Sequence, residues 1–169
     1  EILYVSNVNG NDKVIAYNLY TGEQTILFQT SNTIVQVYAN NAYTYFAIES
    51  KDLQNNSNVT IINKNGETLF DDILAIDLVE FAWNPYEENE LLITKYYPSF
   101  TTEVTLLDVQ TREQKELHVI PYVQWFSSNE IGYFNWNEEG ASLEAPIELY
   151  NLQTESKEQL ITGALLFTS

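Results

Sequence analysis

The chain has no cysteine, no methionine, one histidine and only seven basic residues among its 169. Without cysteine, disulfide bonds and thiolate metal sites are excluded. The single histidine, His118, cannot form a histidine cluster for zinc, and no nucleophile elbow accompanies it. No apolar stretch approaches the roughly 20 residues that a membrane-spanning helix requires. The missing methionine and the glutamate at position 1 indicate a processed form or an excised piece of a longer chain, with any targeting segment removed.

The scarcity of basic residues leaves a formal net charge of −17, because 24 side chains are acidic. No Lys/Arg cluster relieves this charge locally, so phosphate backbones and anionic lipids would be repelled. Nucleic-acid and membrane-surface roles are therefore disfavoured. An exposed acidic surface that keeps the protein soluble is the simpler interpretation, and a cationic partner or divalent cations are the alternative.

Aromatic residues are abundant, with 12 Tyr, 8 Phe and 3 Trp. Aromatic and β-branched side chains fit a pleated, half-buried surface, so this composition favours strands over helices. Short apolar runs alternate with polar turns along the whole chain. The hydrophobic content of 44% is enough for a packed core. These features predict an all-β domain.

A unit of four strands, labelled a to d, recurs along the chain, and residues 79–117 are its clearest copy. The Asx residue that ends strand c recurs at steps of 45, 45 and 43, at Asn18, Asn63, Asp108 and Asn151. An apolar position in strand a recurs at steps of 44, 44 and 42, at Val37, Phe81, Trp125 and Phe167. A period of about 44 residues predicts four-stranded antiparallel blades of a β-propeller. A β-sandwich also has short strands, but it gives no reason for the Asx position and the apolar strand-a position to recur at the same period.

The repeat predicts one propeller domain, residues 1–169, with blades at residues 1–29, 33–71, 77–119 and 121–162. The chain begins at a strand b, and residues 163–169 look like a strand a that would complete the first blade, as in propeller ring closure. Two alternatives follow: a closed ring of four blades, or four consecutive blades of a larger ring. Because strands are expected to end where apolar runs stop, polar b–c loops are predicted at residues 7–12 and 49–58.

These units resemble TolB-like and WD40-like propeller repeats. The best matches are Lys13–Phe28 (KVIAYNLYTGEQTILF) and Glu103–His118 (EVTLLDVQTREQKELH). Phe81–Pro85 (FAWNP) is similar to the Trp-Ser-Pro-Asp-Gly run of TolB-type blades, although Asn replaces Ser and the Gly is missing. The acidic, Asn/Tyr/Lys-leaning composition resembles, more narrowly, the YqgU-like propeller lipoproteins of Gram-positive bacteria. That resemblance implies six blades, an extracellular or cell-envelope location and an interaction platform, with no catalytic residues to carry over.

Few residues are candidates for catalysis or metal binding. His118 is placed in strand d, the outermost strand of a blade, so a surface or structural role is expected and no catalytic residue is predicted. Asp71, Asp72 and Asp77 lie in the connection from strand d to strand a, where carboxylates and carbonyls could bind Ca²⁺. No Asp-x-Asp-x-Asp-Gly loop occurs, so calcium is a weak alternative and no cofactor is expected. Two carboxylates could support glycoside hydrolysis, but the sequence places no pair at the required separation.

Three aromatic residues are candidates for a partner or ligand surface. Tyr96, Tyr97 and Trp136 fall at the ends of strands b, beside the b–c loops, where exposed rings could stack on a sugar or anchor a protein. Packing in the core or at the rim is the simpler role for such rings. Trp125 and Tyr133 occupy positions inside strands and are predicted to be core residues.

Three functions remain open from the sequence. The leading hypothesis is a non-enzymatic propeller that scaffolds protein–protein contacts, outside the cytoplasm and without a membrane-spanning segment. The second is a propeller that binds a carbohydrate or small ligand through the same aromatic residues. The third is a hydrolase or lyase in which carboxylates or His118 meet in the central channel.

Overall fold

A computed structural model describes residues 1–120, 122–135 and 144–165, which form four antiparallel β-sheets. The first sheet contains β1 (Ile2–Val8), β2 (Asn11–Tyr17) and β3 (Gln24–Thr30). The second contains β4 (Thr33–Ala39), β5 (Tyr45–Lys51), β6 (Ser57–Asn63) and β7 (Thr68–Leu74). The third contains β8 (Leu78–Trp83), β9 (Glu90–Tyr96), β10 (Thr102–Asp108) and β11 (Gln114–Leu117). The fourth contains β12 (Gln124–Ser127), β13 (Glu130–Phe134), β14 (Glu144–Asn151) and β15 (Lys157–Leu165).

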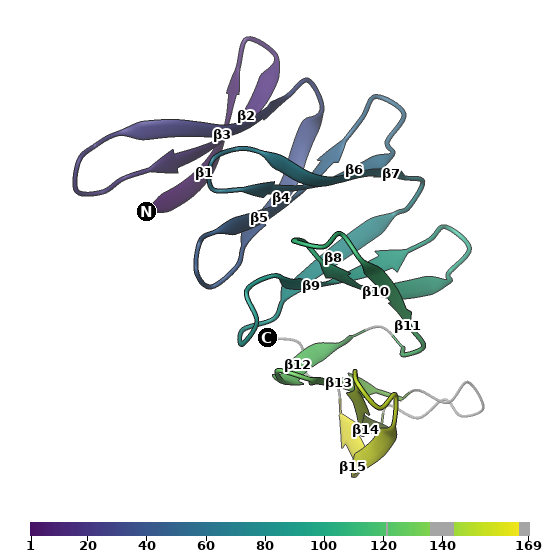
Figure 1. Ribbon diagram of the computed structural model, residues 1–169. Coiled ribbons are helices and arrows are strands. Elements are labelled where there is room, and N and C mark those ends of the chain that lie inside the picture. The colour runs from purple at the N-terminus through teal and green to yellow at the C-terminus, as the bar shows by residue number, and fades with distance from the viewer. Residues whose placement is uncertain (121, 136–143, 166–169) are drawn as a thin grey trace.

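Neighbouring strands in each sheet follow one another in the sequence, so every sheet is a meander. Figure 1 shows the four sheets arranged in succession as a fan, from the purple N-terminal sheet to the yellow C-terminal one. In the second, third and fourth sheets, the edge strands β4, β8 and β12 correspond to strand a of the predicted unit. This is the blade architecture of a β-propeller, as the 44-residue period predicts.

The core lies between the sheets in three clusters of buried side chains. Adjacent residues of one strand belong to different clusters: Ile61 packs between the second and third sheets, whereas Ile62 packs between the first and second. Both faces of the second sheet are therefore covered, which explains why its apolar residues do not alternate cleanly. Tyr133 is buried between the third and fourth sheets and Trp125 packs against the same cluster, as predicted.

The turn after strand c has the predicted Asx geometry in every sheet. At Asp108, the side-chain Oδ1 accepts hydrogen bonds from the backbone N–H of Gln110 (2.8 Å) and Thr111 (2.9 Å). The turns at Asn18 and Asn151 make the same pair of bonds. The turn at Asn63 is one residue shorter, and its Oδ1 accepts from the backbone N–H of Asn65 and Glu67. The recurring Asx column therefore reflects a side chain that satisfies backbone donors in a tight turn.

The same turns require a left-handed residue just before strand d. Gly22 and Gly66 supply it with φ angles of 74° and 80°. In the third and fourth sheets the position is held by Arg112 (φ 65°) and Glu155 (φ 57°), which are not glycines. This conformation costs a residue with a Cβ about 1–2 kcal/mol. The turn is therefore adopted because of its place in the repeat, and not because Arg112 and Glu155 favour it.

Tryptophan side chains link neighbouring blades. The indole Nε1–H of Trp83 donates to the carbonyl of Tyr38 (3.0 Å), and that of Trp125 donates to the carbonyl of Ala82 (2.9 Å). Each bond joins a strand a to the strand a of the preceding sheet. Pairing between β12 and β13 shifts register between Trp125 and Ser127, so a local irregularity follows the second tryptophan.

Buried asparagines at the a–b turns make a second set of links. Asn40 donates through Nδ2 to the carbonyl of Glu88 (3.0 Å), and Asn84 donates to the carbonyl of Ser128 (3.2 Å). Both asparagines are only 1% exposed. The repeat therefore includes polar side chains whose partner is the next blade, which fixes how successive sheets stack.

The prediction of a polar b–c loop at residues 7–12 is wrong. β1 continues to Val8, which pairs with Asn11 across a two-residue turn. Asn9 and Gly10 have φ angles of 56° and 79°. Two consecutive positive φ angles form the type of turn that matches strand twist, and Asn-Gly is the dipeptide best suited to it.

The predicted loop at residues 49–58 is also too long. β5 runs to Lys51 and β6 begins at Ser57, although both strand ends are polar. Ser57 Oγ donates to Glu49 Oε1 (2.8 Å), and Gln36 Nε2 donates to Glu49 Oε2 (2.8 Å). Because the polar side chains satisfy one another, the strands extend past the point where the apolar run stops.

The described residues do not close a ring. The predicted strand a at residues 163–169 begins inside β15, where Ala164 pairs with Ala145 of β14. Residues 163–165 therefore extend the fourth sheet, and residues 166–169 lie outside the described part of the chain. The alternative of a self-closed four-bladed ring is accordingly not what the structure shows.

Candidate functional site

Tyr96 ends β9 with its hydroxyl directed at a carboxylate. The phenol donates to Glu80 Oε2 at 2.8 Å. Burial, followed by the hydrogen bond and charge of Glu80, raises the pKa of Tyr96 well above its usual value. The phenol is therefore a permanent donor that orients Glu80, and the ring is only partly exposed.

Tyr97 follows Tyr96 but has a different environment. Its ring packs against the core cluster between the second and third sheets, and its hydroxyl donates to Glu103 Oε2 (3.1 Å). Glu103 also binds the ammonium of Lys95 (2.6 Å), which is the largest cause of the lowered pKa of this carboxyl. Burial and Glu103 raise the pKa of Tyr97. The third candidate, Trp136, lies outside the described residues, so the surface predicted for the three aromatics stays a prediction.

Two of the b–c loops that the structure describes carry a fully exposed apolar side chain, and neither was predicted from the sequence. Phe100 in loop 97–101 is 99% exposed, and Leu53 in loop 52–56 is 100% exposed. The two loops connect equivalent strands of neighbouring sheets, so they lie on the same rim, which we call the b–c rim. An apolar residue between the polar residues of a short loop was the only signal available in the sequence.

The two loops share one backbone conformation. In each, the first residue donates to the carbonyl of the fifth, and the fourth donates to the carbonyl of the first, with N–O distances of 2.9 to 3.1 Å. The fourth residue is left-handed in both: Asn55 has a φ of 66° and Phe100 a φ of 62°. Asparagine tolerates this conformation, whereas phenylalanine is unfavourable there.

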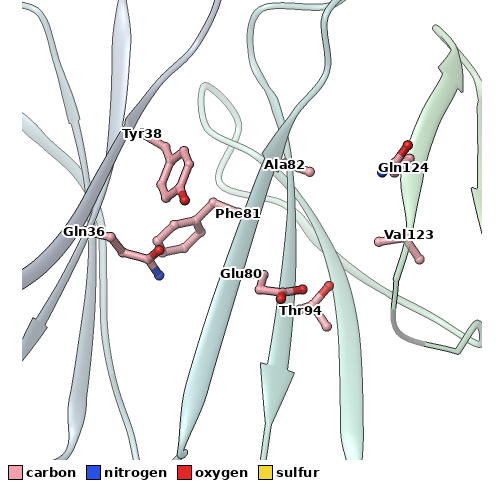
Figure 2. Close-up of a pocket in the computed structure, with 8 residues that line it drawn as sticks. All are labelled: Gln36, Tyr38, Glu80, Phe81, Ala82, Thr94, Val123 and Gln124. Atoms are coloured by element: carbon pink, nitrogen blue, oxygen red, sulfur yellow. The ribbon is translucent and has the colours of Figure 1, made fainter. Parts of the chain in front are cut away.

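A hollow opens along the edges of the inner strands β4, β8 and β12, with a volume of about 300 Å³. The residues that line it are Gln36, Tyr38, Glu80, Phe81, Ala82, Thr94, Val123 and Gln124. Figure 2 shows Gln36, Tyr38 and Phe81 on one side of β8, and Glu80 and Thr94 on the other. Inner strands of a propeller surround its channel, so this hollow occupies the channel side of three consecutive blades.

The amide of Gln36 is fixed at this hollow. Its Nε2 donates both to Glu49 Oε2 (2.8 Å) and to the backbone carbonyl of Val79 (2.7 Å). These bonds use both N–H groups, and within the described part of the chain the carbonyl oxygen accepts no hydrogen bond. Gln36 also links β4 to β8, so the same side chain holds two blades together and presents an acceptor.

The remaining candidates for chemistry lie apart from the hollow. His118 follows β11, is exposed, and accepts a hydrogen bond at its backbone carbonyl from Lys157 Nζ (2.8 Å). Asp71 accepts from the Thr60 hydroxyl (2.7 Å). Within residues 1–120, 122–135 and 144–165, no three His, Cys, Asp or Glu side chains gather closely enough to hold a metal ion. The same residues contain no helix that is long and apolar enough to cross a membrane.

A family model, the YqgU-like 6-bladed beta propeller domain, matches residues 18–169. The chain belongs to this family. The expected resemblance to YqgU-like propellers is thereby confirmed. The family has six blades, whereas the described residues form four sheets. Of the two alternatives, the family model therefore supports four blades of a larger ring over a closed ring of four.

Individual relatives support the same assignment. The chain is 23% identical over 169 residues to the "Uncharacterized lipoprotein YqgU" of Bacillus subtilis (strain 168), covering 99% of this chain and 47% of that protein. The chain thus spans about half the length of this relative. Among solved structures, the uncharacterized protein lmo1340 from Listeria monocytogenes EGD-e has a TM-score of 0.81 at 17% identity, over 99% of this chain and 52% of that one.

The expected TolB-like resemblance is also found at the level of fold. TolB from Acinetobacter baumannii has a TM-score of 0.56 at 11% identity, over 95% of this chain and 40% of that one. At this identity the likeness concerns the fold alone. It supports a propeller of four-stranded blades and carries no residue roles to this chain.

Proposed function

We propose that this chain belongs to a non-catalytic six-bladed propeller that binds a protein partner on the cell envelope of a bacterium. Family membership supports the six-bladed ring. Its lipoprotein relative supports an envelope location by lipid anchoring. The observation that carries the protein-binding role is the state of Phe100 on the b–c rim.

Phe100 has two unfavourable properties in the isolated protein. Its ring is 99% exposed, although burying a phenylalanine is worth about 1.5–3 kcal/mol. Its φ of 62° costs about 1–2 kcal/mol relative to a relaxed backbone. The equivalent position in the neighbouring blade holds Asn55, which suits this conformation. A partner pocket that takes up the ring would offset both costs, because buried aromatic anchors dominate protein interfaces.

Leu53 provides a second anchor on the same rim. It is 100% exposed at the tip of the loop with the same conformation as the Phe100 loop. Two apolar tips from adjacent blades suit a partner with two apolar pockets. Asp52, beside Leu53, has its carboxylate bound to Asn56, so the loop is held rigid. A rigid loop lowers the entropy lost on binding.

The alternative roles have less support. The ring of Tyr97 packs against the core, and the hydroxyl of Tyr96 is already bound to Glu80, so these two residues offer a sugar little free polar or apolar surface in common. A hydrolase or lyase would need convergent acid–base groups, and His118 lies after β11 and does not line the hollow. These observations favour an interaction module over an enzyme.

Site-specific photo-crosslinking in the full-length, envelope-anchored protein tests the role of the rim. A photoreactive phenylalanine analogue at position 100 is expected to give a discrete protein adduct in living cells. The matched control is position 20, because Tyr20 is 98% exposed but lies in a c–d turn. Leu53→Ser is expected to weaken the adduct at position 100. Absence of an adduct at position 100, or equal adducts at positions 100 and 20, would overturn the proposal.

A further inference from the structure

The hollow along β4, β8 and β12 has the dimensions of a small-molecule site. Its volume of about 300 Å³ lies at the lower end of the range for ligand pockets, roughly 300–1,000 Å³. Side chains from three inner strands line it, so its shape depends on the stacking of three blades. The proposed docking role of the b–c rim does not use this hollow.

The lining is rich in acceptors and carries negative charge. Glu80 is the one charged residue among the lining residues. Tyr96 donates to its Oε2, which leaves Oε1 available to a ligand. Lysines at the ends of β5 and β9 bind elsewhere: Lys51 donates to backbone carbonyls and Lys95 to Glu103. The charge of Glu80 is thus free to recognise a cation.

A second acceptor lies on the other side of β8. Both N–H groups of Gln36 are used by Glu49 and Val79, and no donor among the described residues reaches its carbonyl oxygen. Tyr38 and Phe81 stand beside it as an edge-to-face pair, with ring centroids 6.2 Å apart and an interplanar angle of 65°. Carbonyl oxygens and aromatic faces both attract ammonium groups.

Both acceptors are held in place before any ligand arrives. Tyr96 orients Glu80 from the neighbouring strand, and two hydrogen bonds orient Gln36. A preorganised acceptor loses little entropy on binding and gives direction as well as charge. The net charge of −17 would in addition concentrate cations around the protein.

We propose that this hollow binds an organic dication of the α,ω-diamine class, with one ammonium group at Glu80 and the other at Gln36 beside the Tyr38–Phe81 pair. Both acceptors line this one hollow, from opposite sides of β8, and a ligand with an ammonium group at each end matches the pair. The alkyl chain between the two ammonium groups passes along the hollow, which Ala82 also lines on the Glu80 side of β8.

Isothermal titration calorimetry of the purified protein with 1,5-diaminopentane tests the site. The diamine is expected to bind at least tenfold more tightly than pentylamine, and 1,5-pentanediol is expected not to bind. Glu80→Gln should weaken diamine binding at least tenfold. Glu116→Gln, an equal change of charge on the outermost strand β11, should leave it within twofold of the parent protein.

A second variant separates orientation from charge. Tyr96→Phe keeps the charge of Glu80 but removes the hydroxyl that orients it, so diamine affinity should fall severalfold while the thermal unfolding midpoint identifies any loss of folding. Equal binding of the diamine and pentylamine, or equal losses in Glu80→Gln and Glu116→Gln, would indicate non-specific charge attraction and overturn the proposal. Unchanged binding in Glu80→Gln would overturn it as well.

Discussion

At the scale of single residues, the chain holds several non-glycine side chains in left-handed backbone conformations. Phe100 and Arg112, with φ angles of 62° and 65°, are the clearest cases because glycine or asparagine occupies the equivalent positions in other blades. The repeat imposes a similar turn geometry on each copy. A copy whose residue is unsuited to a positive φ is therefore strained.

Phe100→Asn is expected to stabilise the fold while it removes the proposed anchor. Asparagine relieves the strain at φ 62°, so the free energy of unfolding should rise by about 1 kcal/mol in urea titrations. Phe100→Ala is the matched control, because it deletes the ring but keeps a Cβ in the strained position. Equal stabilities of the two variants would contradict the strain argument. The anchor role is checked with a photoreactive residue at position 53: if Phe100→Asn leaves its adduct with the partner at full strength, the anchor role of Phe100 is contradicted.

Single-residue exposure is also where the sequence was least informative. The place of Tyr96 and Tyr97 at a strand end indicates that they are near a loop. It does not indicate whether each ring points into the core or toward solvent. Phe100 was missed because its exposure depends on the geometry of a five-residue turn. The hollow could not be predicted either, since Gln36, Glu80 and Gln124 are widely separated in sequence and meet only when blades stack.

At the scale of strands and turns, the seams between blades depend on side chains that donate to the preceding sheet. Trp83 and Trp125 make the same bond to a strand-a carbonyl. The bond of Trp125 is partly buried, whereas that of Trp83 is exposed. A buried carbonyl that loses its donor has no water to replace it, and this costs about 1–3 kcal/mol.

Trp125→Phe should therefore destabilise the protein more than Trp83→Phe. Both substitutions remove an indole N–H and keep an aromatic ring, which at position 83 still lies against Tyr45. The larger loss is therefore expected where the lost bond is more buried. The difference in the free energy of unfolding should be about 1 kcal/mol, measured by chemical denaturation. Equal losses in the two variants would show that the seam bond at Ala82 is no more important than its exposed counterpart at Tyr38.

Elements were predicted well where one local interaction determines them. The Asx turns at Asn18, Asn63, Asp108 and Asn151 followed from their spacing. Strand ends were predicted poorly where polar side chains are buried in pairs, as at Glu49 and Ser57, because apolar periodicity stops before the strand does. The Asn9–Gly10 turn was missed because it lies within a polar run, although its dipeptide is typical of a tight hairpin.

At the scale of the whole molecule, carboxyl groups that are hydrogen-bonded in the folded state shape the response of stability to pH. Hydrogen bonds lower the pKa of Glu103, chiefly through Lys95, and of Glu148, chiefly through Tyr133. A carboxyl whose pKa is lowered on folding stabilises the native state above its unfolded pKa, near 4.3. This contribution is lost as the pH falls through the lower folded-state pKa.

The free energy of unfolding is accordingly expected to fall as the pH is lowered below about 4. Glu103→Gln should be less stable than the parent at pH 7, because Lys95 loses its partner, and should show a flatter decline in acid. Urea midpoints between pH 3 and pH 7 measure both effects, with Glu113→Gln, in the exposed c–d turn of the same sheet, as the control for net charge. A decline of unchanged steepness in Glu103→Gln would contradict the role of this pair.

The sequence period determined the size of a blade but not the number of blades. Each blade contacts its neighbours, so the repeat pattern records how one sheet stacks on the next and is nearly the same in rings of different size. The family comparison supplies the number six. The described fan of four sheets is compatible with it, because the seams that join the second, third and fourth sheets repeat the same nearest-neighbour bonds.

Those seams also equip the protein with its own optical probes. Trp83 sits at the junction of the second and third sheets, and Trp125 at the junction of the third and fourth. Indole fluorescence shifts in colour when the ring meets water, so each tryptophan would signal the opening of one junction. With the other indoles replaced, emission from either residue would time the separation of a single pair of blades, without any added dye.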